Sequence, residues 1–397
     1  MQLTDKQIKG LDGAVKAYRD GKLLYTIAGY AGTGKSTLVK YIIAALGEFG
    51  INPEKDVCYV AYTGKACTVL QKKGCKNVRT GHKLLYHSIP KESGGYMRIP
   101  YQVGEIEYKV IVLDEVSMFP ATMMTQLRKH GIFILALGDP FQLPPIDKNE
   151  DNHILDKPDI FLDEIMRQAQ ESEIIRLTMD IRAGKPIKFM QGEELQVLPE
   201  KELSTGMLNW ADQVLCATNA SRINLNNEMR QLNGFNAGPQ EGDKVICLRN
   251  YWELSSAEDN ALVNGTIGYL KNPFESFIQL PRWTRPNVSR IDVIQCDFIT
   301  EDGDIFPNLM IDKEMFYTGE PTLDWKTSYK LGRNVLTRGL IPLQFAYGYA
   351  ITCHKAQGSE WNKVLAIEEP FPFVKEEHAR WLYTACTRAS EKLVLLR

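Results

Sequence analysis

Short runs of apolar, β-branched residues alternate with helical patterns along the first 140 residues. Four runs, each followed by a turn signal, predict strands at Leu23 to Gly29, Asp56 to Thr63, Lys109 to Asp114 and Ile132 to Gly138. Helical spacing of apolar residues follows the first two runs, over Ser36 to Leu46 and Lys65 to Gln71. This alternation predicts a parallel sheet whose ligands bind beyond the carboxyl ends of its strands.

The pattern changes twice farther along the chain. An acidic stretch from Asp147 to Asp163 predicts a crossing to a second α/β domain, which begins with a helix at Ser172 to Ala183 and a strand and helix at Gln213 to Gln231. Between about 242 and 339, short β-like runs (Lys244 to Leu248, Gly265 to Leu270, Ile291 to Ile299) are separated by Asn-Gly, Asp-Gly and Pro turns, which predicts an inserted antiparallel meander or small β-barrel. The expected domains are therefore residues 1–160, residues 161–241 with 340–397, and an inserted domain at 242–339.

Composition and charge exclude several classes of protein. Apolar residues make up 44% and charged residues 24% of the 397 residues, which excludes wholesale disorder. Lys plus Arg (47) and Asp plus Glu (49) nearly cancel, so a polyanion must be bound by a local basic patch. No apolar run approaches the ~20 residues that span a bilayer. The eight scattered cysteines favour reduced thiols, so we expect a cytoplasmic protein with no membrane contact, encoded by a cell or by a phage acting in its host.

A phosphate-binding motif follows the first predicted strand and opens the first helix. Residues 29 to 36, GYAGTGKS, fit the pattern GxxxxGK[ST] in the context that the motif requires. Glycines let backbone N–H groups surround a phosphate, Lys35 would neutralise β- and γ-phosphate oxygens, and the Ser36 hydroxyl would bind Mg²⁺. The simpler alternative is a glycine-rich helix cap. The expected ATP contacts are Gly29, Ala31, Gly32, Thr33, Gly34, Lys35, Ser36 and Thr37.

Acidic and amide side chains follow the next strands of the predicted sheet. Asp114 and Glu115 close the apolar run VIVL, where a second Mg²⁺ ligand and a water-activating base belong. Gln142 follows the fourth strand, where a neutral amide can sense the γ-phosphate. A solvated acidic pair and a Pro-rich loop are the alternatives, and the nearby phosphate motif favours the catalytic interpretation.

A local basic patch supplies the positive charge that the overall balance lacks. It consists of Lys65, Lys72, Lys73, Lys76, Arg79 and Lys83, interleaved with Thr63, Thr80, His82 and Tyr86. Cations, hydroxyls and aromatic rings together suit contacts to phosphates and bases of a nucleic acid. A solvated helix face would show the same charges.

Together these elements resemble the superfamily 1 helicases, specifically the 5′-to-3′ branch (superfamily 1B) that includes RecD and the phage Dda helicase. Further motifs carry the resemblance nearly to the end of the chain: TDKQ at 4–7, YTGKA at 62–66, TGH at 80–82, LDEIMR at 162–167, AITCHKAQGS at 350–359 and YTACTRA at 383–389. Tyr30 stands where this family more often has a small residue or proline, and we expect little consequence of that difference.

The resemblance implies two RecA-like parallel-sheet motor domains, with a β-hairpin inserted in the first at about 87–103 and a small β-barrel in the second. It also implies roles for individual residues. Gln7 would read the adenine, Arg167 and Arg388 would reach the phosphates from the second domain, and Gly358 would lie at the nucleotide. The residues implied to contact DNA are Thr63, Lys65, Thr80, His82, Tyr96, Thr352, His354 and Lys355.

The function expected from these residues is an ATP- and Mg²⁺-dependent helicase that translocates 5′-to-3′ on single-stranded DNA and unwinds tailed or forked duplex. The resemblance implies a monomer that works beside single-strand-binding or replication proteins. A P-loop kinase would explain Lys35 and Asp114 but would leave the motifs at 350–359 and 383–389 without purpose. A single-stranded-DNA-binding protein that uses ATP only as a switch would not need Glu115 and Arg388.

Overall fold

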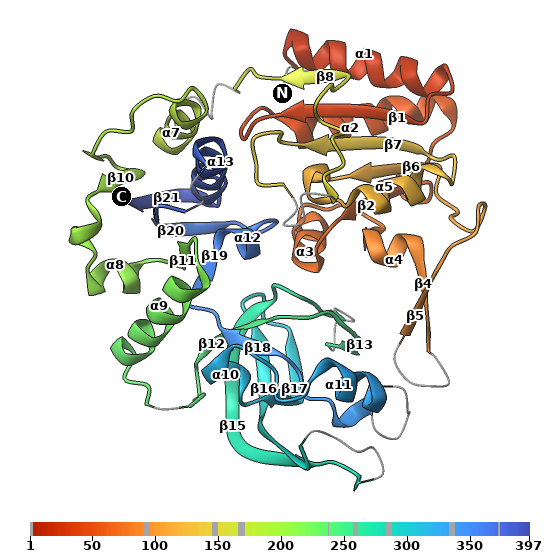
Figure 1. The fold of residues 1–397 in the computed structure, drawn as a ribbon. Helices are drawn as coiled ribbons and strands as arrows, with labels where there is room; N and C mark the ends of the chain where they lie inside the picture. Colours follow the sequence, from red (N-terminus) through yellow and green to blue (C-terminus); the bar gives the residue numbers. More distant parts are fainter. Residues whose placement is uncertain are drawn as a thin grey trace. The chain divides into compact units, whose positions relative to one another are not determined.

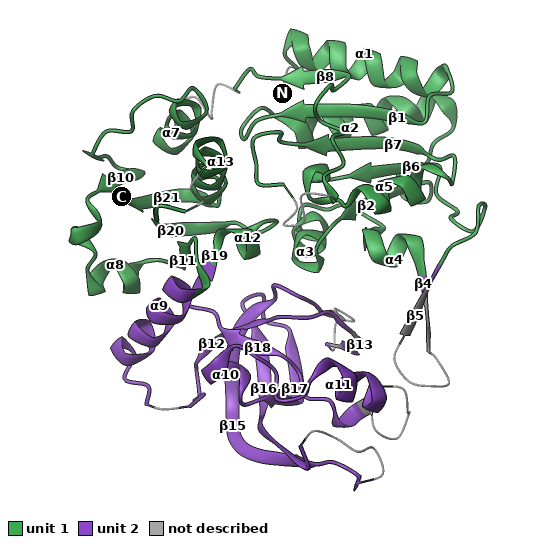
Figure 2. Ribbon diagram, in the orientation of Figure 1, with its two compact units in different colours: residues 1–86, 100–219, 352–397 green, residues 87–99, 220–351 purple. Residues whose placement is uncertain are grey.

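The computed structural model describes residues 3–90, 96–144, 150–165, 171–236, 238–256, 261–282, 288–332, 338–371 and 374–397. The chain divides into two compact units, which Figure 2 colours separately: residues 1–86, 100–219 and 352–397 form one, and residues 87–99 and 220–351 form the other. The first unit contains most of two sheets with their helices, one parallel throughout and one mixed, which we call the first and second lobes. The second unit is built around an antiparallel sheet.

The first lobe is a six-stranded sheet in the order β3-β2-β6-β7-β1-β8 (Figure 1). All of its neighbouring strands are parallel, as the sequence predicts. The four predicted strands are present with ends shifted by one or two residues. The strands are β1 (Leu24–Gly29), β2 (Val57–Ala61), β3 (Val78–Thr80), β6 (Val110–Leu113), β7 (Phe133–Gly138) and β8 (Ile160–Leu162).

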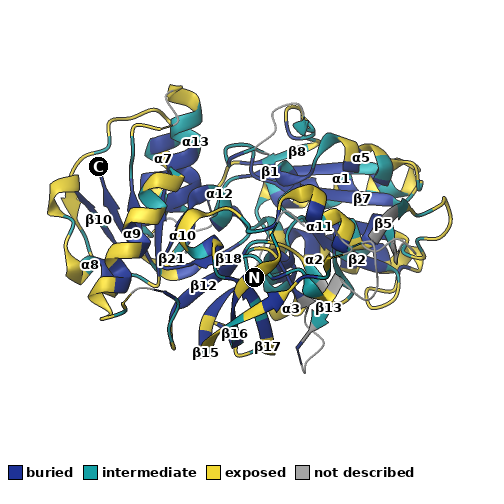
Figure 3. Ribbon diagram, turned by 60° about the horizontal axis from the view of Figure 1, so that its bottom comes forward, coloured by how far each residue is buried: buried dark blue, intermediate teal, exposed yellow. Residues whose placement is uncertain are grey.

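Helices cover both faces of this sheet because successive residues of each strand point to opposite sides. Val110 and Val112 pack in one core cluster with residues of α1 (Asp5–Arg19) and α2 (Lys35–Leu46). Ile111 and Leu113 pack in a second cluster with residues of α4 (Gly81–Leu85) and α5 (Ala121–Arg128). Helix α3 (Gly64–Lys72) follows β2. Figure 3 shows these strands as buried and the outer faces of the helices as exposed.

The second lobe is a six-stranded sheet in the order β19-β11-β20-β21-β10-β9. Its strands are β9 (Met190–Gln191), β10 (Leu195–Leu198), β11 (Gln213–Cys216), β19 (Ala350–Thr352), β20 (Trp361–Ile367) and β21 (Ala389–Leu396). Strand β21 contains some of the last residues of the chain, yet it lies inside the sheet and pairs in parallel with both β10 and β20. The helices of this part of the chain are α7 (Glu173–Arg182), α8 (Thr205–Trp210), α9 (Asn219–Leu232), α12 (Cys353–Ala356) and α13 (Lys375–Cys386).

The second unit contains a five-stranded antiparallel sheet in the order β17-β16-β15-β12-β18. Leu343, just before β18, forms a bridge with Ile311 of β17, so the two edges of the sheet approach each other as they do in a barrel. The strands are β12 (Lys244–Cys247), β15 (Ile267–Gln279), β16 (Arg290–Thr300), β17 (Ile305–Asp312) and β18 (Phe345–Tyr347). Smaller elements are the pairs β4 (Tyr86–Pro90) with β5 (Tyr96–Pro100) and β13 (Tyr251–Ser255) with β14 (Ala261–Leu262), and the helices α10 (Met315–Thr318) and α11 (Trp325–Gly332).

A buried ion pair joins α9 to the start of the antiparallel sheet. The Arg230 guanidinium donates from Nε to Oδ1 of Asp243 at 2.9 Å and from Nη2 to Oδ2 at 3.0 Å. The hydroxyl of Tyr349 donates to the same carboxylate at 3.1 Å. Asp243 directly precedes β12, the first strand of the sheet, and Tyr349 follows β18, its last strand. The ion pair and the tyrosine hydrogen bond therefore connect both ends of the chain segment that forms the sheet to α9.

Two negative findings complete the description. Among the described residues, no helix has the length and apolar character needed to cross a membrane. None of the eight cysteines forms a disulfide, in agreement with the expected reduced thiols.

Candidate nucleotide-binding cleft and nucleic-acid surface

The phosphate loop connects β1 to α2 through glycines in the left-handed region. Gly32 has φ 75° and Gly34, the residue before the first helical residue, has φ 78°, which other residues rarely adopt. The Lys35 ammonium folds back over the loop and donates to the carbonyl of Gly29 at 2.7 Å and to that of Tyr30 at 3.0 Å. The loop and the lysine therefore stand together at the start of α2, where a helix favours an anion.

The electrostatics of Lys35 reflect its burial among carboxylates. Burial lowers the pKa of Lys35, and the negative charges of Asp139, Asp114 and Glu115 oppose that shift. These three carboxylates come from the carboxyl ends of β6 and β7, so the sheet gathers residues that are more than 75 positions apart in sequence around one ammonium group.

The acidic pair follows β6 directly, as predicted. Glu115 has φ 50°, an uncommon conformation for a residue with a side chain, and its backbone N–H donates to Oδ1 of Asp114 at 3.0 Å. Burial raises the pKa of both carboxyl groups, and Arg388 opposes the shift of Glu115. Oε2 of Glu115 is buried and has no hydrogen-bond partner among the described residues. A strained backbone and an unpaired buried oxygen together are typical of a functional site.

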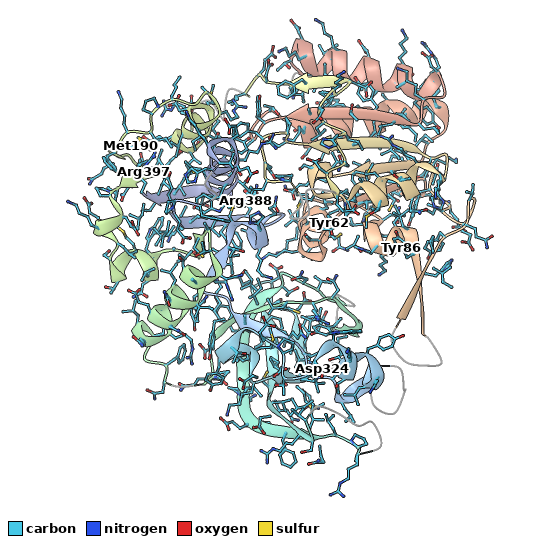
Figure 4. All side chains as sticks on the ribbon, in the orientation of Figure 1. Tyr62, Tyr86, Met190, Asp324, Arg388 and Arg397 are labelled. Atoms are coloured by element: carbon cyan, nitrogen blue, oxygen red, sulfur yellow. The ribbon has the colours of Figure 1, made fainter. Side chains whose placement is uncertain are left out.

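The second lobe brings Arg388 to this acidic pair. Nη1 of Arg388 lies 3.9 Å from Oε1 of Glu115, and Arg388 is only 6% exposed (Figure 4). The guanidinium also donates to the carbonyls of Thr384 and Ser359 and to the hydroxyl of Thr387, each at 3.1 Å. Arg388 and Glu115, 273 residues apart in the sequence, are therefore neighbours, and the contact of Arg388 with the phosphates stays a prediction.

Gly358 lies against the first lobe beside the acidic pair. It has φ 76°, and a Cβ added there would lie 3.4 Å from Oε2 of Glu115 and 3.1 Å from Oγ1 of Thr63. A side chain at this position would therefore crowd both residues. The structure places Gly358 next to the predicted base and a predicted DNA contact, and its expected contact with the nucleotide stays a prediction.

Three side chains of the second lobe hold the loop that follows β7, and the sequence did not single them out. The buried Tyr383 hydroxyl donates to the Asp139 carboxylate and accepts from the backbone N–H of Ala31 at 3.0 Å. The hydroxyl of Thr384 accepts from the backbone N–H of Leu143 at 3.0 Å.

Gln357 completes this set by donating to the carbonyl of Leu143 at 2.8 Å. All three side chains belong to the two C-terminal motifs, so their position in those motifs was the available signal. A single residue, Tyr383, thus contacts the phosphate loop and the loop after β7 together.

Three other predicted nucleotide residues have different outcomes. The buried Oε1 of Gln142 has no hydrogen-bond partner among the described residues, which leaves it available to a ligand. Gln7 is 1% exposed; its Nε2 donates to the carbonyl of Thr33 at 3.2 Å and its Oε1 accepts from the N–H of Thr4 at 3.0 Å. In the structure Gln7 holds the phosphate loop through its hydrogen bond to Thr33. Its contact with adenine stays a prediction. Arg167 lies outside the described residues.

The donor set for Mg²⁺ is small but suitable. The described residues contain no group of three or more His, Cys, Asp and Glu side chains able to hold a metal ion. Mg²⁺ commonly takes only one or two protein oxygens and completes its shell with phosphates and water. The hydroxyl of Ser36 on the first turn of α2 and the half-buried carboxylate of Asp114 fit that requirement.

The predicted nucleic-acid contacts of the first lobe lie at helix starts. Thr63 and Thr80 cap α3 and α4, and their hydroxyls accept from the N–H groups of Ala66 and Lys83, each at 3.2 Å. A row of rings lies beside them: the rings of Tyr62 and His82, and those of His82 and Tyr86, have centroids 6.1 Å apart (Figure 4 labels both tyrosines). Aromatic rings that are half-buried and follow one another suit base stacking.

The predicted contacts of the second lobe surround α12. Thr352 is the residue before α12, and His354 and Lys355 lie within it. Burial lowers the pKa of His354, so its ring is neutral at pH 7. Lys65 of the first lobe lies 5.2 Å from the centroid of the Trp361 ring in the second, a cation–π contact between the lobes. The side chain of Tyr96 lies outside the described residues.

Comparison with known proteins agrees with this arrangement. An AAA domain family model matches residues 2–201, and a UvrD-like helicase C-terminal domain model matches residues 347–396. The ATP-dependent RecD2 DNA helicase of Deinococcus radiodurans is 26% identical over 406 residues, which cover 94% of this chain and 46% of that protein. The uncharacterized protein R530 of Acanthamoeba polyphaga mimivirus is 30% identical, with 94% of both chains covered.

Solved structures agree on the fold. A Pif1 helicase structure concerned with unwinding at forked double-stranded DNA has a TM-score of 0.55 and 18% identity, covering 100% of this chain and 92% of that one. A Bacteroides Pif1 helicase in complex with ADP-AlF3 and single-stranded DNA has a TM-score of 0.54 and 17% identity, with the same coverage. This chain spans less than half of the length of RecD2. The AAA domain and UvrD-like helicase C-terminal domain models, together with the similarity to the RecD2 DNA helicase, show that the chain belongs to the superfamily 1B helicases.

Proposed function

We propose that this protein is an ATP-dependent DNA helicase that translocates 5′-to-3′ on single-stranded DNA. The observation that carries the proposal is the approach of Arg388 to Glu115 at 3.9 Å across the two lobes. A P-loop enzyme that acted alone on its nucleotide would not need an arginine from a second lobe. Here hydrolysis depends on the relation between the lobes, which is what a motor requires.

Each residue of the cleft has a part in the proposed reaction. Lys35 and the loop N–H groups bind the phosphates, Glu115 accepts a proton from the attacking water, and Arg388 stabilises negative charge as the bond to the γ-phosphate breaks. Gln142 senses the γ-phosphate, and Arg167 is a second arginine for the same charge. Ser36 and Asp114 would hold Mg²⁺, which neutralises phosphate charge when it is bound.

DNA is the proposed partner of the surface that surrounds the same cleft. A single strand that crosses the first lobe would meet the helix-capping hydroxyls of Thr63 and Thr80. It would also meet the neighbouring rings of Tyr62, His82 and Tyr86, which suit base stacking. Residues of α12 extend the same chemistry on the second lobe. The relatives named above as DNA helicases support this choice of nucleic acid. Action as a monomer on tailed or forked duplex, beside single-strand-binding or replication proteins, belongs to the same proposal.

The two insertions also receive roles by proposal. The strand pair β4 and β5, with the predicted turn at Ser93 to Gly95 outside the described residues, would separate the duplex strands, and the antiparallel sheet at 242–339 would be the inserted barrel. Replacing Ser93 to Arg98 by a short Gly-Ser turn would then lower unwinding while ATPase activity persists. Equal unwinding by the shortened chain would contradict the role of the strand pair.

One assay tests the central proposal. Strand displacement is measured on duplexes with a 5′ or a 3′ single-stranded tail, beside ATPase activity with and without single-stranded DNA. We expect ATP-dependent displacement on the 5′-tailed substrate and stimulation of hydrolysis by single-stranded DNA. Hydrolysis without stimulation would favour the kinase alternative, and nucleotide binding without turnover would favour the ATP-switched binding protein.

A further inference from the structure

Arg182, the last residue of α7 in the second lobe, contacts the phosphate loop of the first lobe. Its guanidinium carbon lies 3.2 Å from the centroid of the Tyr30 ring, the second residue of the loop. The Phe161 ring packs edge-on against Tyr30, with centroids 5.0 Å apart at 86°. Tyr30 is therefore fixed by a ring of the first lobe while it supports a cation of the second.

Tyr30 also connects this arginine to the lysine of the loop. Its carbonyl accepts from Nζ of Lys35 at 3.0 Å, and its N–H donates to the carbonyl of Leu162 at 3.4 Å. Two cations thus contact one residue, Lys35 at its backbone and Arg182 at its ring. Both positive charges belong to the immediate surroundings of the phosphate loop.

The guanidinium of Arg182 is incompletely satisfied. Its Nε and Nη1 atoms are buried and have no hydrogen-bond partner among the described residues. The carboxylate of Asp163, which accepts a hydrogen bond from Lys6, interacts with Arg182 through its charge. Stacking on a ring compensates a buried cation only in part, whereas an anion with matching oxygens compensates it well. An apolar side chain could have covered the Tyr30 ring without the free-energy cost of removing a charged group from water. The unpaired N–H groups therefore suit an anion that is not among the described residues.

We propose that Arg182 is a phosphate-binding residue of the nucleotide site, a further arginine from the second lobe, and that Tyr30 is the residue that positions it. The inference rests on the proposed ATP site and adds a ligand to it. The phosphate chain of a nucleoside triphosphate is the anion that suits a planar fork beside this loop, since a guanidinium can donate to two phosphate oxygens at once. Tyr30, in which the loop departs from the related family, gains a specific use.

The test measures equilibrium binding of fluorescently labelled ATP and ADP, with Mg²⁺ and without DNA, to the full chain. Arg182→Ala and Arg182→Gln should each weaken ATP binding by about tenfold or more, as expected when a charge-assisted contact is lost. Arg182→Lys keeps the charge without the fork and should fall between them and the unmodified chain. Arg176→Ala, on the exposed side of the same helix, is the matched control and should bind as the unmodified chain does.

Tyr30 variants test the positioning role separately. Tyr30→Phe keeps the ring and should bind ATP normally, whereas Tyr30→Ala should weaken binding. The double variant Tyr30→Ala with Arg182→Ala should bind no more weakly than Arg182→Ala, because both changes remove one contact. Losses that multiply in the double variant would overturn the positioning role, since the two residues would then act independently.

Lys35→Ala separates this inference from the function on which it rests. If Lys35→Ala loses ATP binding while the affinity of Arg182→Ala stays within about twofold of the unmodified chain, the range of a neutral surface change, the role of Arg182 is overturned and the ATP site stands. If the unmodified chain binds no nucleotide, both are overturned. A loss in Arg182→Ala that is larger for ATP than for ADP supports the inference, because a residue that only held the lobes together would not distinguish them.

Discussion

Each lobe contains a strand that is followed directly by a turn and a helix: β1 and α2 in the first lobe, β11 and α9 in the second. The backbone N–H groups of the two turns have different surroundings. After β1 the turn is a glycine-rich loop that ends at Lys35. After β11 the turn contains no glycine, and the backbone N–H groups of Ala217 and Thr218 donate to the carboxylate of Glu369, with a distance of 3.0 Å for Thr218. The Thr218 hydroxyl donates to the same side chain at 3.0 Å.

The difference explains why, among the described residues, we propose a nucleotide site after β1 and not after β11. N–H groups at the start of a helix attract an anion in both places. The second lobe supplies that anion from its own Glu369, whereas the first keeps its loop for an outside phosphate. The second lobe then contributes side chains such as Arg388 and Tyr383 to the first lobe's site. The proposed function therefore assigns the chemistry to the first lobe and its control to the second.

Removing the lysine of the open turn should have the largest effect. In Lys35→Ala we expect ATPase activity to fall by at least about 10²-fold, because a preorganised cation at the developing phosphate charge is lost. The measurement is steady-state phosphate release with single-stranded DNA present. Lys40→Ala, an exposed lysine of the same helix, should be as active as the unmodified chain. Similar activity of both variants would show that the open turn is not the phosphate site.

Changing the predicted base should separate binding from turnover. Glu115→Gln keeps the shape but cannot accept the proton, so turnover should fall by about 10²-fold while ATP affinity is retained. Single-turnover hydrolysis beside equilibrium binding would show the split. The exposed Glu107 offers a control in Glu107→Gln. Unchanged turnover in Glu115→Gln would leave the first lobe without an identified base.

Arg388→Lys tests whether a residue of the second lobe controls ATP hydrolysis at the first. The charge remains but the planar fork is lost, so hydrolysis should fall by about tenfold while affinity for single-stranded DNA without nucleotide stays unchanged. DNA affinity is measured by fluorescence anisotropy, with the exposed Arg19→Lys as control. A collapse of DNA affinity with normal hydrolysis would make Arg388 a DNA contact and would contradict the division between the lobes.

The filled turn should matter for stability alone, which is the smallest effect. In Glu369→Ala the N–H groups of Ala217 and Thr218 lose their partner, and the free energy of unfolding should fall by about 1–3 kcal/mol. Chemical denaturation measures this loss, and Glu360→Ala, at an exposed position nearby in sequence, should show almost none. A clear change in ATP affinity in Glu369→Ala would mean that the second turn takes part in nucleotide binding.

The sequence predicts what is local in this molecule. The strands of the first sheet are apolar runs bounded by turns, so β1, β2, β6 and β7 are found within two residues of their expected ends. The sequence predicts too short a strand for β15. The predicted run ends at Leu270, before Pro273, whereas the strand continues to Gln279. A bulge between Lys271 and Phe274 accommodates the proline, and such a bulge depends on pairing with β16.

The candidate site was predicted where motifs carry it and missed where only folding creates it. Lys35, Asp114, Glu115 and Arg388 stand in motifs that can be recognised in the sequence alone. The contact of Tyr383 with Asp139 joins residues 244 positions apart, and no local pattern reports it. The carboxylate that fills the second turn is equally remote, because Glu369 lies about 150 residues from Thr218. Such pairs are set by the packing of two lobes and not by spacing along the chain.

The interior position of β21 has a consequence for the order in which the molecule can fold. The first sheet is complete once residue 162 is available, since β8 is its last strand. The second sheet has β10 at residues 195–198 but must wait for residues 389–396 to fill the place between β10 and β20. Long sequence separation slows pairing, and during synthesis the amino-terminal part folds first. The phosphate loop and its whole sheet are therefore available for folding more than 200 residues before Arg388 and β21 are synthesised.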